Sequence, residues 1–290
     1  MDDAESLDTL LKQSVAKSSM ADIDKSLDLL IATANLILRS GIQTDSDNTA
    51  AEMAMFFLLK SNEHMATLVH LSATNCHRDA AIIARTMVEG AACLNWALLD
   101  VPTRTDKWFW FTLIHEWRTL QANQARGIPY DSEHLVRVAA EMEARGIGYI
   151  KRNLERDIQT AKASGKIKVY PGDPWAHEWT QMSIIGMIEL LDENDSLVHF
   201  FRSSSQWVHW VSPPMFRALK SDQDFRVFDG EAWTELAASM IAAVSAYGQI
   251  LVLVCRTLVL DHQSEVEQVL NDLHASLRKT FLPLTLDFET

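Results

Sequence analysis

Cysteine is scarce in this chain, with three residues among 290. Cys76, Cys93 and Cys255 are odd in number, and no Cys-x-x-Cys pair occurs among them. The sequence therefore offers neither a disulfide framework nor the paired cysteines of a zinc ribbon. Because all three lie in apolar, helix-like contexts, we expect reduced and buried thiols in a cytoplasmic protein.

Positive charge is also in short supply, since 26 Lys and Arg stand against 39 Asp and Glu, for a formal net charge of −13. This balance argues against a protein that binds a DNA groove through bulk positive potential. It leaves open an enzyme that holds RNA locally through two or three arginines.

Long uncharged stretches are rare, and only residues 236–254 (LAASMIAAVSAYGQILVLV) approach the length of a membrane span. This stretch contains Ser239, Ser245 and Gln249, and neither an aromatic belt nor a cluster of Lys and Arg flanks it. A helix buried on all sides by its neighbours has the same composition. The acidic start of the chain, MDDAESLDTLLKQ, also lacks the basic-then-apolar order of a signal peptide. We therefore expect a core helix here and no membrane association.

Apolar residues recur with helical spacing along nearly the whole chain. We expect an all-α fold, a multi-helix bundle of about ten helices with no significant sheet, in which residues 225–228 form at most a short strand. The expected division is an N-terminal helical hairpin (1–46), a helical core domain (47–262), and a C-terminal helix and tail (263–290). Within the core domain, long helices are expected over residues 49–73, 77–99, 103–125, 195–211 and 231–260.

The motifs of common enzyme classes are missing. No phosphate-binding P-loop, nucleophile elbow or dinucleotide fingerprint occurs in the sequence. His115-Glu116 and His177-Glu178 resemble the start of the zinc-protease motif HExxH, but neither is followed by the second His. The Glu-x-x-His pairs of di-iron bundles are absent too. We expect no metal and no cofactor.

Two distant segments nevertheless place ionisable residues in apolar helical surroundings. In residues 80–99 (AAIIARTMVEGAACLNWALL), Arg85 and Glu89 lie four positions apart on one helix face. In residues 196–213 (SLVHFFRSSSQWVHWVSP), a three-four-three spacing places four residues on one stripe: His199, Arg202, Gln206 and His209. An ion buried without a partner costs several kcal/mol. We therefore expect the two helices to converge on one inward-facing polar cluster.

The same two segments resemble a large, mostly prokaryotic family catalogued as a domain of unknown function. Its members carry an "aRslxE" segment and, later, a "YrxxSxxvHxs" segment, which are matched here by Arg85, Glu89, Arg202, Ser205 and His209. Phe201 replaces the usual Tyr, and Val211 stands where the last small polar residue belongs. The similarity spans roughly residues 55 to 260. It implies a helical fold and gives no activity.

A further resemblance, to the HEPN ribonucleases, rests on Arg202 and His209 with six residues between them. Those helical proteins cleave RNA without metal, usually with an Arg and a His from each of two protomers. The resemblance implies that His209 acts as general acid or base at a 2′-hydroxyl. Arg202 would bind the phosphate, and Arg85 and Glu89 would orient both groups. A chain with this many Arg and His residues is expected to contain such an Arg–His spacing by chance, so the spacing alone does not indicate a ribonuclease.

Three interpretations of the cluster therefore stay open. It can be a polar network that only holds helices in register. It can be a binding site for a small anionic ligand or a partner, with Gln206, Ser205 and His199 as binding residues. It can also be the site of a metal-independent endoribonuclease of the defence or toxin type. A homo-oligomer formed through the aromatic run WFWFTLIHEW (108–117) is expected as well.

Overall fold

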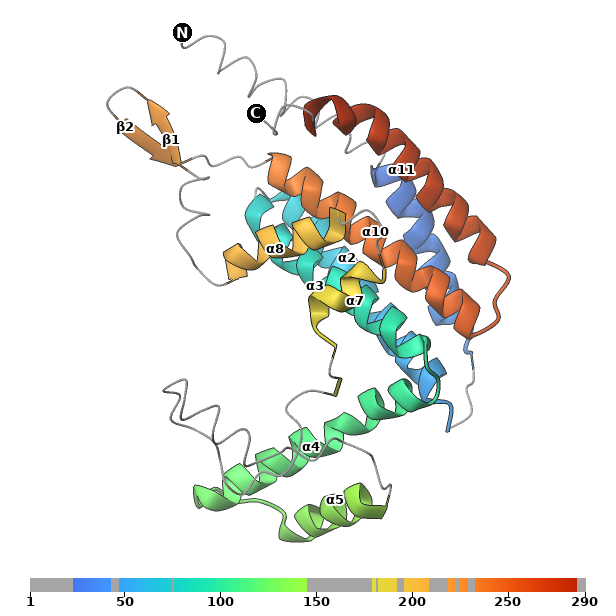
Figure 1. Cartoon of the computed structure of the whole chain (residues 1–290), viewed down its shortest axis with the longest axis vertical. Coiled ribbons are helices and arrows are strands. Elements are labelled where there is room, and N and C mark those ends of the chain that lie inside the picture. The colour runs from blue at the N-terminus through green and yellow to red at the C-terminus, as the bar shows by residue number, and fades with distance from the viewer. Residues whose placement is uncertain are drawn as a thin grey trace. The chain divides into compact units, whose positions relative to one another are not determined.

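A computed structural model describes residues 23–42, 47–74, 76–144, 179–180, 182–191, 196–208, 219–222, 225–228 and 233–285 (Figure 1). A helix over residues 23–39 precedes the labelled elements. The helices that follow are α2 (Thr49–Ala73), α3 (His77–Leu98), α4 (Thr103–Ala125), α5 (Ser132–Ala144), α7 (Ile184–Glu189), α8 (Ser196–Val208), α10 (Trp233–Thr257) and α11 (Gln263–Thr285). The expected all-α fold is confirmed.

The strand expected at residues 225–228 is present as half of a small hairpin. Strand β1 (Leu219–Asp222) pairs with β2 (Phe225–Phe228) in antiparallel register, with Leu219 opposite Phe228. In the part of the chain that the structure describes, this hairpin is the whole of the sheet. It does not change the fold class.

Two helices have the bounds expected from periodicity, and one of them shows why it begins where it does. Helix α2 starts after Asn48, whose side-chain oxygen accepts a hydrogen bond from the backbone N–H of Ala51 at 3.0 Å. This bond satisfies one of the free N–H groups at the helix start. Helix α4 likewise covers residues 103–125, whereas α3 ends one residue before the expected Leu99.

The chain divides into two compact units. The first unit comprises Met1–Trp96 and Ile184–Thr290, and the second is Ala97–Ser183. The division reflects contacts in space, and the expected boundaries after residues 46 and 262 stay a prediction.

Helix α10 is the central element of the first unit, where it packs against α2, α8 and α11. Among the described helices it alone is long and apolar enough to cross a membrane, over Glu235–Thr257, yet 83% of that window is buried inside the protein. Its interior polar groups have partners, because Tyr247 donates a hydrogen bond to Asn62 at 2.7 Å and Ser245 lies 3.0 Å from Nε2 of His274. Burial in the protein therefore accounts for the apolar composition of α10.

A helix-interior glycine sets how closely α10 and α11 approach. A Cβ atom at Gly248 would lie 2.7 Å from Cγ of Leu270, closer than real Cβ atoms come to their neighbours. Leu270 is itself buried. The absence of a side chain at Gly248 is thus required by packing.

The second unit is built on the aromatic run. Helices α4 and α5 bury a cluster made of Phe111, Leu113, Ile114, Val138 and Met142, against which Trp110, Trp117, Leu120 and Trp179 pack. Helix α5 is capped by Asp131, whose carboxylate accepts a hydrogen bond from the backbone N–H of His134 at 2.9 Å. This hydrogen bond lowers the pKa of Asp131. Several of the aromatic side chains therefore serve the core of this unit.

Candidate functional site

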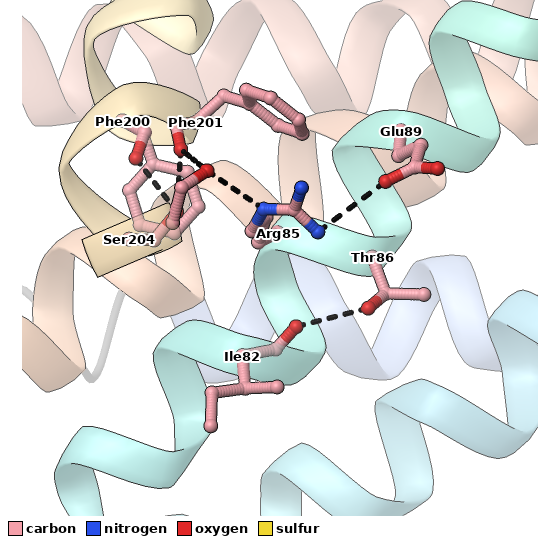
Figure 2. A network of polar contacts seen from close by, with 8 residues as sticks. Ile82, Arg85, Thr86, Glu89, Phe200, Phe201 and Ser204 are labelled. Atoms are coloured by element: carbon pink, nitrogen blue, oxygen red, sulfur yellow. Dashed lines mark hydrogen bonds and ion pairs between the residues drawn. The ribbon is translucent and has the colours of Figure 1, made fainter. Parts of the chain in front are cut away.

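Arg85 is the residue through which α3 and α8 meet (Figure 2). Its Nε donates a hydrogen bond to Oγ of Ser205 at 2.9 Å, and its Cζ lies 4.3 Å from the centroid of the Phe201 ring. Its Nη1 lies 3.4 Å from Oε2 of Glu89, one turn further along α3. The structure thus brings together Arg85, Glu89 and Ser205, from segments that lie 120 residues apart.

The serine run of α8 explains why Ser205 can accept this bond. Ser205 donates its own hydroxyl proton to the carbonyl of Phe201 at 2.6 Å, and Ser204 donates to the carbonyl of Phe200 at 2.7 Å (Figure 2). Such bonds to the preceding helical turn are common for serine in helices. Because the hydroxyl proton of Ser205 is engaged by its own helix, its lone pairs remain available to Arg85.

Two residues of the polar stripe expected to point inward on α8 do not do so. His199 and Arg202 are both exposed. Among residues 196–205 of α8, the buried ones are Leu197, Val198, Phe201 and Ser204. The expectation that His199 and Arg202 are buried with Arg85 is therefore wrong, because the apolar stripe of α8 faces the core and these two side chains are left outside.

Two members of the expected cluster cannot be placed. Gln206 belongs to α8, but its side chain is outside the described part of the structure, and His209 lies beyond the described residues altogether. The roles suggested for Arg202, His209 and Gln206 stay predictions.

A cavity of about 200 Å³ lies beside the Arg85 contacts, and Glu89 is part of both. Helix α2 lines it with Phe56, Phe57 and His64 among others. Helix α3 contributes Glu89, Gly90 and Cys93, α10 adds Ile250, and the cavity is partly open to solvent. All of these residues belong to the first unit. The cavity therefore lies within a single compact body.

His64 brings an unpaired polar atom to this region. Its Nε2 is buried and has no hydrogen-bond partner among the residues that the structure describes. Burial lowers the pKa of His64, and the positive charge of Lys60 lowers it further, while Glu63 opposes both. The imidazole is therefore held in its neutral form near neutral pH.

Cys93 is also held neutral. Burial raises the pKa of its thiol to about 12, and the negative charge of Glu89 acts in the same direction. Its Sγ lies 3.9 Å from Sδ of Met187 on α7. A thiol with so high a pKa carries almost no thiolate at neutral pH, so Cys93 is a poor nucleophile.

The match to a family model covers the part of the chain that carries these contacts. Residues 51–226 match the model of a family of unknown function, DUF5677. The chain belongs to this family. The DUF5677 match confirms the resemblance drawn from the two charged segments, and it assigns no activity. Neither the curated proteins nor the solved structures contain a significant match to the chain.

The DUF5677 region holds the α2 and α3 walls of the cavity, and Ile250 is contributed from beyond it. The sequence pattern did not predict a cavity at Phe56, Phe57, His64 and Gly90. The sequence holds one signal for it, because Gly90 lies inside a predicted helix, where glycine is costly. Metal chemistry has no site in the described ranges, where no group of three His, Cys, Asp or Glu side chains could hold an ion.

Proposed function

We propose that this DUF5677 protein binds a small ligand in the cavity between α2 and α3. One observation carries the proposal: Gly90 lines the cavity although neither a close neighbour nor the backbone conformation requires glycine there. A Cβ atom there would lie 3.6 Å from Cδ1 of Phe57, which is ordinary van der Waals contact, and the backbone does not adopt a positive φ. Glycine in a helix interior costs about 1 kcal/mol relative to alanine. Gly90 keeps the cavity open at the expense of helix stability.

The contacts of Arg85 give this residue a structural role beside the cavity. Ser205, Glu89 and the ring of Phe201 already engage the guanidinium. An anion would have to displace these partners to bind Arg85, so the arrangement does not favour an anion-binding role. Instead, Arg85 ties α3 to α8 and fixes the carboxylate of Glu89 at the edge of the cavity.

The test is a thermal-shift screen of small neutral, cationic and anionic compounds against the wild type and Gly90→Leu. A leucine side chain at position 90 would occupy the cavity. We expect compounds that raise the melting temperature of the wild type to lose at least tenfold in affinity for Gly90→Leu and to bind Arg202→Ala unchanged. Compounds that stabilise the wild type and Gly90→Leu equally would place binding elsewhere.

A second candidate function is metal-independent RNA cleavage, and the exposure of Arg202 favours it. An arginine that contacts a phosphate must be accessible, and Arg202 is. In this reaction the 2′-oxygen attacks phosphorus and the bond from phosphorus to the 5′-oxygen breaks, which leaves a 2′,3′-cyclic phosphate and a 5′-hydroxyl. His209 would remove the 2′-hydroxyl proton or supply the proton to the 5′-oxygen, and Arg202 would offset the charge on the phosphate.

The two candidates are separated by one assay. For the ribonuclease, protein in EDTA would cut RNA to cyclic ends, and Arg202→Ala and His209→Ala would each abolish cleavage without lowering the melting temperature. Light scattering would also show a homo-oligomer, because the HEPN arrangement joins residues of two protomers. Intact RNA after prolonged incubation with a folded oligomer would eliminate this candidate.

A further inference from the structure

We infer that the cavity between α2 and α3 takes an uncharged ligand about the size of one aromatic ring. This inference rests on the proposed function and names the class of ligand. The volume of about 200 Å³ is the first reason. An apolar cavity of roughly 150 Å³ holds benzene, so the present cavity has room for a ring with a small substituent.

The walls are the second reason, because they suit an aromatic ring. Phe56 and Phe57 meet edge to face, with ring centroids 5.8 Å apart and an interplanar angle of 78°. Met87 and Ile250 complete the apolar lining, and both are almost fully buried. Aromatic rings and a thioether both make favourable contacts with a further ring.

The third reason is that the charged groups of the lining, Lys60 and Glu89, are in contact with solvent. Lys60 is exposed, and Glu89 is 44% exposed and paired with Arg85. The remaining titratable groups of the lining, His64 and Cys93, are neutral at neutral pH, because burial lowers the pKa of the first and raises that of the second. A charged ligand would lose its hydration against the apolar walls and gain only the attraction of these solvent-exposed charges, which water screens.

Two helix-interior glycines of the first unit, Gly248 and Gly90, differ in the space around them. At Gly248 the neighbouring Leu270 leaves no room for a side chain, whereas at Gly90 the first atom of a side chain fits. A substitution at Gly90 can therefore fill the cavity without first forcing two helices apart. This makes position 90 the point at which binding can be tested with the fold kept.

The experiment uses the full-length protein and four single-ring probes at pH 7. Toluene and phenol are uncharged, and benzoate and benzylammonium carry opposite charges. Binding is measured by the rise in melting temperature with probe concentration and by ligand-observed NMR. The proteins are the wild type, Gly90→Ala, Gly90→Leu and, as a control of equal added bulk on the exposed face of α2, Ala66→Leu.

We expect toluene and phenol to bind the wild type and Ala66→Leu at least tenfold more tightly than the two charged probes. Gly90→Leu abolishes this binding. Gly90→Ala weakens it while raising the melting temperature of the unliganded protein, because alanine favours the helix. If Gly90→Leu fails to fold, Gly90→Ala tests the same prediction, with a smaller expected loss of probe affinity.

The failures are distinguishable. If benzoate or benzylammonium binds as tightly as toluene and Gly90→Leu blocks it, the ligand class is overturned and the cavity remains a binding site. The same follows if none of the four probes binds but other compounds from the screen do so in a manner that depends on Gly90. If the probes bind and neither Gly90 variant changes their affinity, the cavity itself is not the site and both proposals fall.

Discussion

Arg85 and Arg202 lie in the two apolar segments that contain ionisable residues, and their side chains differ in burial. The Arg85 side chain is 20% exposed and has partners on its own helix and on α8. Arg202 lies on the outer face of α8 and is exposed. An arginine in an apolar segment is therefore not buried for that reason alone. It is drawn inward where a neighbouring turn and a facing helix both offer it acceptors.

The partners of Arg85 also explain why its partial burial is tolerated. The hydrogen bond to Ser205, the ion pair with Glu89 and the Phe201 ring each replace part of the lost hydration. Arg202 needs no such replacement because water surrounds it. The two arginines should consequently differ in their contribution to stability far more than in their contribution to charge.

The largest effect is expected from Arg85→Ala. The substitution removes a hydrogen bond from a charged donor and a cation–π contact, and we expect the free energy of unfolding to fall by about 2–3 kcal/mol. Urea denaturation followed by circular dichroism measures this loss. A fall below about 0.5 kcal/mol would mean that α3 and α8 are held together without Arg85.

Phe201→Leu should have the next largest effect, at about 1–1.5 kcal/mol, because leucine keeps most of the buried volume and removes the ring under the guanidinium. Phe201 is buried. A double-mutant cycle with Arg85→Met isolates the part that belongs to the contact between the two side chains. We expect a coupling energy of about 0.5–1 kcal/mol. If the losses in the free energy of unfolding are additive, the cation–π contact does not contribute to stability.

A smaller loss, of about 0.5–1 kcal/mol, is expected for Ser205→Ala. The substitution removes the acceptor of Arg85 Nε, but Arg85 is partly exposed and water can replace the missing oxygen. Ser203→Ala is the matched control, because Ser203 donates to Phe200 on the same helix, and Arg85 bonds to Ser205. If both variants lose the same free energy of unfolding, the loss comes from the serine's bond within α8, and the contact with Arg85 contributes nothing measurable.

Local sequence patterns were sufficient to predict where the helices α2 and α4 begin and end. The bounds of α2 and α4 follow from apolar spacing and from neighbours such as Asn48 and Gly127, and Gly127 ends α4 in the positive-φ conformation that glycine adopts freely. These signals act within one or two turns of chain. For this reason they can be read without knowing the rest of the fold.

The orientation of α8 and the cavity could not be read in the same way. The polar stripe through Arg202 and the apolar stripe through Phe201 are both regular, and only the area that each buries decides which one faces α3. The cavity depends on distances between helices that lie far apart in the sequence. The sequence shows a glycine inside a helix at position 90, but only the position of Phe57 in the structure shows that there is room for a side chain.

The smallest effect is expected from Arg202→Ala, which should change the free energy of unfolding by less than about 0.5 kcal/mol, because exposed side chains without defined contacts contribute little. The same urea experiment measures it against Arg85→Ala. A loss comparable to that of Arg85→Ala would show that Arg202 is engaged by a partner, and light scattering of the variant would show whether that partner is a second protomer. With unchanged stability, a loss of RNA cleavage in Arg202→Ala would report on RNA binding or catalysis and not on folding. This position therefore separates structure from activity.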